Sequence, residues 1–118
     1  MKYSESLKRH EDFKYVYKNG RSFANKYLVM YVLENHLNKN RLGISVSKKV
    51  GNSVVRHRIT RLVRESYRLN EEMFNSGLDI VIIARNAAAG IRYAAVEKAF
   101  WHLAKLHKIT KQEDYRHN

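Results

Sequence analysis

Basic side chains are concentrated in one stretch of the chain, residues 41–68, where ammonium and guanidinium groups are available to bind phosphate. The stretch holds eight Lys or Arg residues against one acidic residue, Glu65, a local net charge of +7. These cations are Arg41, Lys48, Lys49, Arg56, Arg58, Arg61, Arg64 and Arg68. Such a local excess of positive charge attracts a polyanion. The spacing of the arginines decides whether they lie on one face and can bind the same phosphate backbone.

A helix expected over residues 54–70 places most of these arginines away from its apolar side. At about 100° per residue, apolar residues form one face and four basic residues form the opposite face. The apolar residues are Ile59, Leu62, Val63 and Leu69, and the basic residues are His57, Arg61, Arg64 and Arg68. This helix can bury one side and offer the other to a nucleic-acid backbone. The alternative is a solvated face with salt bridges, for which Arg61 and Glu65 have the i, i+4 spacing.

The segment before this helix joins a strand end to a helix start and contains Lys48, Lys49 and Gly51. Helix N-terminal amides and their dipole favour an anion, glycine permits close approach, and the lysines add charge. Asn52 or Ser53 can cap the helix. The phosphate-binding pattern G-x-x-x-x-G-K-[ST] is absent, so an ordinary turn with exposed lysines remains the alternative.

Three aromatic residues, Phe13, Tyr17 and Tyr31, are candidates for stacking on unpaired bases. Each base that stacks on an aromatic side chain contributes about 1–3 kcal/mol to the free energy of binding. Phe13 and Tyr17 are also spaced i, i+4 on a predicted helix, which is typical of core packing. Spacing alone leaves both interpretations open.

The residue types needed for catalysis or metal binding do not converge in the sequence. The six histidines show no H-x-x-x-H or H-E-x-x-H spacing, and we expect them at the surface or at polar edges. The eleven acids are scattered, and there is no cysteine. We therefore expect no catalytic residue and no metal site in this protein.

Composition points to a basic, nucleic-acid-binding domain. The 118 residues fit one domain, residues 1–118, and the formal net charge is +12. A nucleic acid is a commoner partner of such a charge than an anionic membrane. The absence of cysteine favours a reducing compartment, so we expect a cytoplasmic location. Apolar runs such as residues 80–84 are far shorter than the ~18–20 residues of a membrane span, and we expect no apolar signal segment at the N-terminus.

The elements expected around these residues are three helices and at least three strands. We expect helices over residues 11–19, 54–70 and 93–108, strands over residues 27–33, 41–47 and 78–85, and an extra short strand over residues 21–24. Gly20 is expected as the C′ residue of the first helix. The last helix is expected to bury Val96, Ala99, Phe100, Leu103 and Leu106.

These elements predict an α+β fold of order α-β-β-(β)-α-β-α. Strands 27–33 and 41–47 are expected to form a hairpin, and strands 41–47 and 78–85 to run parallel through the intervening helix. The result is a two-layer sandwich in which helices cover one face of a mixed sheet. The ends, residues 1–8 and 109–118, lack a periodic apolar pattern and are expected to fray.

The central segment resembles the signature of the bacterial ribonuclease P protein component family. It runs Arg41-Leu-Gly-Ile-Ser-Val-Ser-Lys-Lys-Val-Gly-Asn-Ser-Val-Val-Arg-His-Arg-Ile-Thr-Arg-Leu-Val-Arg-Glu. The pattern Glu-Asp-Phe-x-x-Val-Tyr-x-x-Gly at residues 11–20, the strand end Ile-Ile-Ala-Arg at residues 82–85 and the last amphipathic helix are similar to that family in order and spacing.

The resemblance implies a protein subunit that assists a catalytic RNA in removing the 5′ leader from precursor tRNA. It implies that Mg²⁺ is bound mainly by the RNA, that the protein lowers the Mg²⁺ requirement, and that no small molecule is a substrate. The residues implied to contact the catalytic RNA are Lys48, Lys49, Asn52, Arg56, His57, Arg58, Arg61, Arg64 and Arg68. Those implied to bind the leader, in a cleft between the first helix and the sheet, are Phe13, Tyr17 and Tyr31.

The resemblance also implies a fold like domain 2 of ribosomal protein S5, with a left-handed βαβ crossover where the general rule predicts a right-handed one. Two positions depart from the family pattern. The Arg-Asn-Arg triplet reads Arg56-His57-Arg58, which makes the middle charge pH-dependent, and Thr60 stands at a usually basic position. The alternatives are a ribosomal-protein-like RNA-binding module without a role in cleavage, and a nuclease that cleaves without RNA.

Overall fold

The computed structural model describes residues 1 and 3–111 of the chain. The strands are β1 (Ser4–Ser6), β2 (Arg21–Ala24), β3 (Leu28–Glu34), β4 (Asn40–Ser45) and β5 (Leu78–Ala84). The helices are α1 (His10–Asn19), α2 (Ser53–Arg68) and α3 (Tyr93–His107), with short 3-10 helices at Glu71–Met73 and Asn86–Ala88. The predicted helices and strands are confirmed with small shifts at their ends, and the fold is α+β with a mixed sheet.

The sheet has the strand order β1-β4-β5-β3-β2, with β5 at its centre. β4 and β5 are parallel and joined through α2, which confirms the predicted strand-helix-strand unit. The predicted hairpin of β3 and β4 is wrong, because both strands pair with β5 instead. β5 is apolar and buried along nearly its whole length, so it needs partners on both edges. The hairpin in the structure joins β2 and β3.

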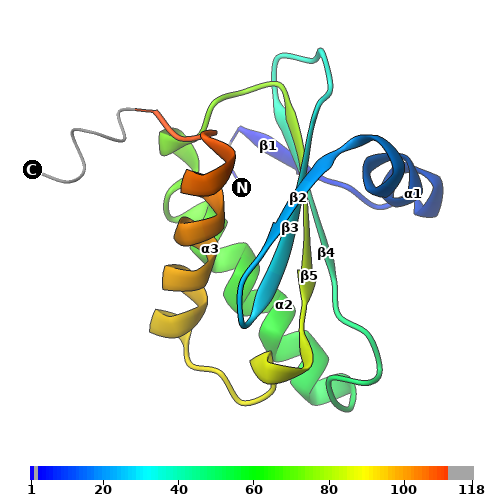
Figure 1. Cartoon of the computed structure of the whole chain (residues 1–118), viewed down its shortest axis with the longest axis vertical. Helices are drawn as coiled ribbons and strands as arrows, with labels where there is room; N and C mark the ends of the chain where they lie inside the picture. Colours follow the sequence, from blue (N-terminus) through cyan, green and yellow to red (C-terminus); the bar gives the residue numbers. More distant parts are fainter. Residues whose placement is uncertain (2, 112–118) are drawn as a thin grey trace, which may run out of the picture.

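The helices lie on both faces of the sheet. Figure 1 shows α2 and α3 on one face and α1 on the other. The expectation that all helices cover one face is therefore wrong for α1. The reason is that successive side chains of β5 point to opposite faces of the sheet. Ile80 and Ile82 face the main core, whereas Val81 between them packs with Leu7 and Val16 on the other face.

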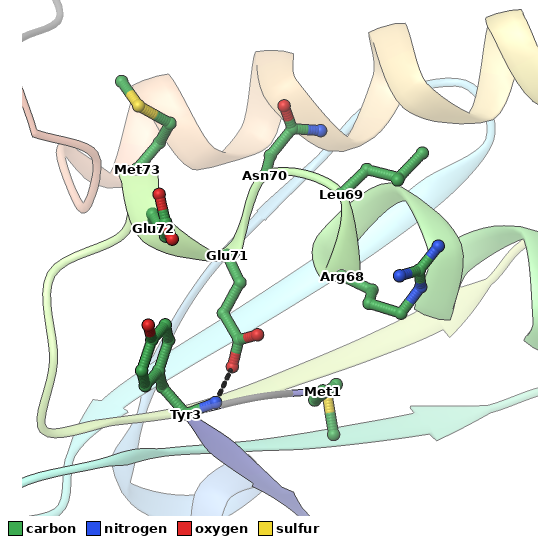
Figure 2. Close-up of a pocket in the computed structure, with 8 residues that line it drawn as sticks. All are labelled: Met1, Tyr3, Arg68, Leu69, Asn70, Glu71, Glu72 and Met73. Carbon is green, nitrogen blue, oxygen red and sulfur yellow. Dashed lines mark hydrogen bonds between the residues drawn. The ribbon is translucent and has the colours of Figure 1, made fainter.

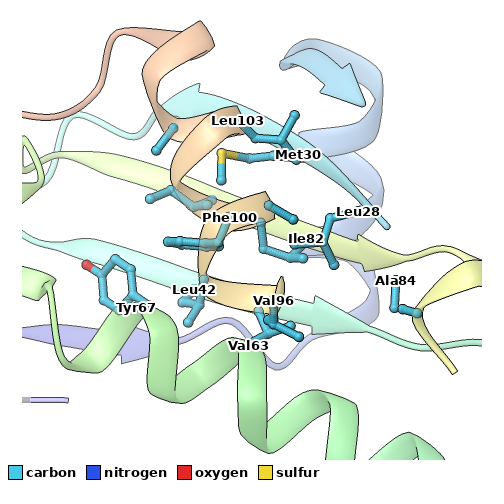
Figure 3. Close-up of a cluster of buried hydrophobic side chains, with 14 of the residues drawn as sticks. Leu28, Met30, Leu42, Val63, Tyr67, Ile82, Ala84, Val96, Phe100 and Leu103 are labelled. Carbon is cyan, nitrogen blue, oxygen red and sulfur yellow. The ribbon is translucent and has the colours of Figure 1, made fainter. Parts of the chain in front are cut away.

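The main core lies between the sheet and the α2–α3 layer. Figure 3 shows Met30 and Ile82 of the sheet against Phe100 and Leu103 of α3, with Tyr67 of α2 beside them. Side chains that are fully buried in this way contribute about 1.5–3 kcal/mol each. This core fixes the orientation of α2 and α3 relative to the sheet.

The first residues are more ordered than their composition predicts. Ser4–Ser6 forms an edge strand parallel to β4, the Ser4 hydroxyl lies 2.7 Å from the Tyr67 hydroxyl, and Leu7 is buried. The expectation that residues 1–8 fray is wrong for residues 4–7, because backbone pairing with β4 needs no apolar pattern. At the other end, Ile109 is buried and Thr110 bridges to Phe74, while residues 112–118 lie outside the described residues.

Gly20 ends α1 in a different way from the expected one. Its φ is −83°, so it is not a left-handed C′ residue. A Cβ atom there would lie 2.8 Å from the Val16 carbonyl oxygen and 3.0 Å from that of Val32. Glycine is needed at this position because α1 and β3 approach closely.

The last helix buries a histidine, His107, although the histidines are expected at the surface or at polar edges. Val96, Phe100, Leu103 and His107 follow one face of α3, whereas Leu106, expected in the core, is 42% exposed. His107 Nε2 lies 2.9 Å from the Met30 carbonyl oxygen, and the ring meets Phe23 edge-on at 4.8 Å. A carbonyl oxygen only accepts, so Nε2 carries the proton of the neutral ring.

The stability of the protein is expected to fall below pH ~6.5 because of His107. Burial holds the pKa of this imidazole below its usual value, and a second proton on Nδ1 would find no acceptor among the described residues. As the pH falls through about 6.5, the unfolded chain takes up a proton that the folded chain resists, so the free energy of unfolding decreases.

The test compares urea unfolding of the wild type and His107→Gln at pH 7.5 and 5.5. The Gln amide keeps a donor for Met30 but does not titrate. The wild type should lose more stability between the two pH values than the variant, by at most about 1.4 kcal/mol. Equal losses would contradict the role given to His107.

Candidate nucleic-acid interface

α2 is fixed at its start by a cap and along its length by three buried residues. The Asn52 side-chain oxygen accepts the Val55 N–H at 3.0 Å, which confirms Asn52 as the N-cap. Ile59, Val63 and Tyr67 have no exposed surface and anchor the helix on the sheet. The side of α2 opposite these residues therefore faces solvent.

The exposed side of α2 carries the predicted basic residues. His57, Arg61, Arg64 and Arg68 are exposed, which confirms the predicted basic face. Arg56 and Arg58 flank this face and are half-buried. Arg56 also donates from its guanidinium to the Gly51 carbonyl oxygen at 3.1 Å, which ties the preceding loop to the helix. We call His57, Arg61, Arg64 and Arg68 the α2 basic face.

The loop before α2 holds its two lysines at the surface. Val50 is buried, and its N–H donates to the Ser47 carbonyl oxygen at 3.1 Å, which closes a turn. Lys48 and Lys49 lie inside this turn with exposed side chains. They are thus held near the α2 N-terminus, where the helix dipole favours an anion.

Two cations of the basic stretch are engaged by acids. Arg68 pairs with Glu65 through both of its fork nitrogens, so the predicted pairing of Glu65 with Arg61 is wrong. The Arg68 guanidinium holds the pKa of the Glu65 carboxyl below its usual range. Arg41 forms a bidentate pair with buried Asp79 at 2.6 and 2.8 Å. Within the described part of the chain, Arg61 and Arg64 have no acidic partner.

Phe13, Tyr17 and Tyr31 form one cluster on the opposite face of the sheet. The ring centroids of Tyr17 and Tyr31 are 5.0 Å apart and those of Phe13 and Tyr17 are 6.3 Å apart. All three rings are half-buried over the small core under α1. We call these three residues the aromatic cluster. The rings are thus part of a core and also reach the surface.

A glycine that the sequence reasoning did not assign to the site makes room for the aromatic cluster. A Cβ atom at Gly43 of β4 would lie 2.7 Å from Phe13 Cζ. An isolated glycine within an apolar strand signals such a close approach. Burial raises the pKa of the Tyr17 hydroxyl, and a hydrogen bond with Ser45 opposes this shift. Tyr17 therefore stays neutral at pH 7 and can offer a hydrogen bond as well as a ring.

The hollow shown in Figure 2 lies away from the aromatic cluster and meets the α2 basic face only at Arg68. It is bounded by Tyr3, the end of α2 and the short helix after it, and Glu71 accepts the Tyr3 N–H there at 2.8 Å. Glu71 and Glu72 give this hollow carboxylates, which repel phosphate. It does not suit an RNA backbone.

The described residues do not bring together a metal-binding group. Across residues 1 and 3–111, no three His, Asp or Glu side chains gather closely enough to hold an ion. In the same part of the chain, no helix has the length and apolar character needed to cross a membrane. The chemistry that the described surface can supply is attraction of phosphate and stacking on bases.

Known proteins match nearly the whole chain. The family model described as Ribonuclease P matches residues 1–109. A ribonuclease P protein component of Lachnoclostridium phytofermentans is 67% identical over 111 residues, covering 94% of this chain and 96% of the relative. The one from Alkaliphilus oremlandii is 50% identical over 105 residues, covering 89% of this chain and 92% of the relative.

Solved structures of this kind share the fold. The ribonuclease P protein of Staphylococcus aureus is 36% identical with a TM-score of 0.83, covering 88% of this chain and 95% of that one. The protein of Thermotoga maritima is 31% identical with a TM-score of 0.76, covering 82% of this chain and 92% of that one. Both sequence and fold therefore agree with the resemblance found in the motif.

Proposed function

Since the chain belongs to the ribonuclease P protein family, we propose that it binds a catalytic RNA through α2 and assists removal of the 5′ leader from precursor tRNA in the cytoplasm. One observation carries this proposal. The α2 basic face and the aromatic cluster lie on opposite faces of the sheet. Two RNA segments can therefore be bound at the same time without competing.

The α2 basic face supports binding to the phosphate backbone of the catalytic RNA. Guanidinium groups pair with phosphate oxygens, often in a bidentate way. Arg61 and Arg64 are free to do so because Glu65 is taken by Arg68. Lys48, Lys49 and the capped start of α2 extend the same surface. His57 adds a donor in place of the Asn of the family triplet.

The aromatic cluster supports binding to the single-stranded leader. Unpaired bases stack on aromatic side chains without requiring a particular sequence. Neighbouring groups hold the rings in position, because Phe13 packs on Gly43 and Tyr17 packs on Tyr31. A leader can vary in sequence between precursors, so a sequence-tolerant surface fits this ligand.

The cleavage chemistry is assigned to the catalytic RNA and its Mg²⁺. Among residues 1 and 3–111, no three His, Asp or Glu side chains gather closely enough to hold the ion. The contribution of the protein is electrostatic. Its 23 Lys and Arg residues replace part of the counterions that packed RNA phosphates otherwise require.

The double variant Arg61→Gln/Arg64→Gln should bind the catalytic RNA more weakly while the fold stays intact. Both side chains are exposed, so their loss leaves the core unchanged. Two lost phosphate contacts should reduce the slope of log K against log[salt] by about 1.4–1.8. Filter binding of the catalytic RNA over a series of salt concentrations measures this slope.

Lys14→Gln/Lys18→Gln is the matched control, since it removes the same charge from exposed positions of α1. Its slope should stay near that of the wild type. An unchanged slope for the α2 variant, or a large fall in its Tm, would contradict the α2 assignment.

A further inference from the structure

The outward side of α3 carries a second row of basic side chains. Lys98, His102 and Lys105 are spaced i, i+4 and i+7 and therefore share one side of the helix. At 1.5 Å per residue they span about 10 Å along the axis. Lys98 and His102 are exposed and Lys105 is half-buried. We call these three residues the α3 row.

The acid on α3 does not neutralise this row. Glu97 accepts from the Tyr93 hydroxyl at 3.1 Å and from the Asn70 amide at 3.3 Å, which turns it toward α2. The ion pairs within the described part of the chain involve Arg9, Lys39, Arg41 and Arg68. Among the described residues, Lys98 and Lys105 thus have no acidic partner.

The structure also fixes the direction in which His102 can donate. The Asn25 amide nitrogen lies 3.1 Å from His102 Nδ1 and also donates to the Ala99 carbonyl oxygen at 3.0 Å. An amide nitrogen only donates, so Nδ1 accepts and the proton of the neutral ring is on Nε2. Asn25 is itself held by the turn before β3, since its side-chain oxygen accepts the Leu28 N–H at 3.0 Å. His102 therefore presents a fixed N–H beside the two lysines.

We propose that the α3 row is a second contact surface for the phosphate backbone of the catalytic RNA. α3 lies next to α2 on one face of the sheet, and the aromatic cluster lies on the other. An RNA that covers the outward side of α2 therefore has α3 beside it. Two ammonium groups and one N–H donor, without an acid among them, match phosphate oxygens. This inference rests on the proposed function and extends the RNA footprint from one helix to the whole helical layer.

The test is the salt dependence of catalytic-RNA binding by Lys98→Gln/Lys105→Gln. The slope of log K against log[salt] should fall by about 1.4–1.8, which corresponds to roughly 25- to 60-fold weaker binding at 0.1 M salt if the two proteins bind equally at 1 M. Lys14→Gln/Lys18→Gln, with the same change of net charge, should retain nearly the wild-type slope. Equal losses in the two variants would show a general charge effect and overturn the proposal, as would an unchanged slope for the α3 variant.

Site-specific photocrosslinking to the catalytic RNA tests the same surface without removing the two lysines, so it can be used even if the double variant is poorly folded. The chain has no cysteine, so a photocrosslinker can be attached to a single new one. Ala94→Cys places it one turn before Lys98 on the exposed side of α3, and Tyr15→Cys places it on the exposed side of α1. Crosslinks to the catalytic RNA from position 94 but not from position 15 are expected. A lack of crosslinks from position 94 would overturn the proposal.

Failure of the proposed function gives a different result from failure of this inference. If the wild type itself shows no salt-dependent binding to the catalytic RNA, the proposed function fails. If the wild type binds and depends on Arg61 and Arg64 but not on Lys98 and Lys105, only the α3 assignment fails. The Lys98→Gln/Lys105→Gln variant is also tested for binding to phosphatidylserine vesicles. If it loses vesicle binding but binds the catalytic RNA as the wild type does, the α3 row is a lipid-binding surface and the proposal is overturned.

Discussion

Holoenzyme carrying Tyr17→Ala should bind a precursor tRNA with several leader nucleotides about 5- to 160-fold more weakly than the wild type. Tyr17 is the central ring of the aromatic cluster, in contact with both Phe13 and Tyr31. Loss of one base–aromatic stack costs about 1–3 kcal/mol, which gives this range of affinities. The measurement is the affinity of holoenzyme for precursor tRNA at saturating catalytic RNA.

The loss should depend on the leader. A precursor with a single leader nucleotide should bind wild-type and Tyr17→Ala holoenzyme with nearly equal affinity. Tyr15→Ala is the matched control, because Tyr15 lies on the same helix but is 63% exposed and outside the cluster. Truncation of a fully buried aromatic ring costs about 3–5 kcal/mol of folding free energy. If Tyr17→Ala lowers the affinity for both precursors equally and also causes a large fall in Tm, the role of Tyr17 is structural and the leader assignment is contradicted.

The position of α2 and its basic face were predictable because they depend on local rules. Helical periodicity separates Ile59 and Val63 from Arg61 and Arg64, and Asn52 is a strong N-cap residue. These features involve residues within a few turns of each other. The structure moves the ends of the helix by only one or two residues.

The strand pairing was not predictable in the same way, because it is set by contacts between distant residues. Residues 27–33 and 41–47 are close in sequence, which favours a hairpin, but Met30 and Ile44 both pair with Ile82 of β5. The nearly unbroken apolar run of β5 is the signal for a central strand. The same run explains α1, since Val81 needs cover on the second face.

Within the site, residue spacing alone does not distinguish between equivalent charged partners. Glu65 is spaced for a pair with either Arg61 or Arg68, and the structure selects Arg68. Glu97 stands beside Lys98 in the chain, yet it turns to Asn70. Such choices depend on side-chain directions that spacing does not determine.

The Mg²⁺ dependence of cleavage should change strongly when the protein is added to the catalytic RNA. Basic side chains along α2 reduce repulsion between RNA phosphates, so less Mg²⁺ is needed to hold the RNA and the precursor together. The concentration of Mg²⁺ that gives half-maximal cleavage should therefore be lower with the protein than without it. The Arg61→Gln/Arg64→Gln protein, added at the same concentration, should lower this Mg²⁺ concentration less than the wild type does.

The central claim is that this chain assists a catalytic RNA and has no nuclease activity of its own. Cleavage of a leader-bearing precursor tRNA at low Mg²⁺ tests it most directly, with the RNA alone, the protein alone and both together. The account predicts rapid removal of the leader only in the mixture and no cleavage by the protein. Cleavage by the protein after all contaminating RNA is removed, or a mixture no faster than the RNA alone, would contradict it.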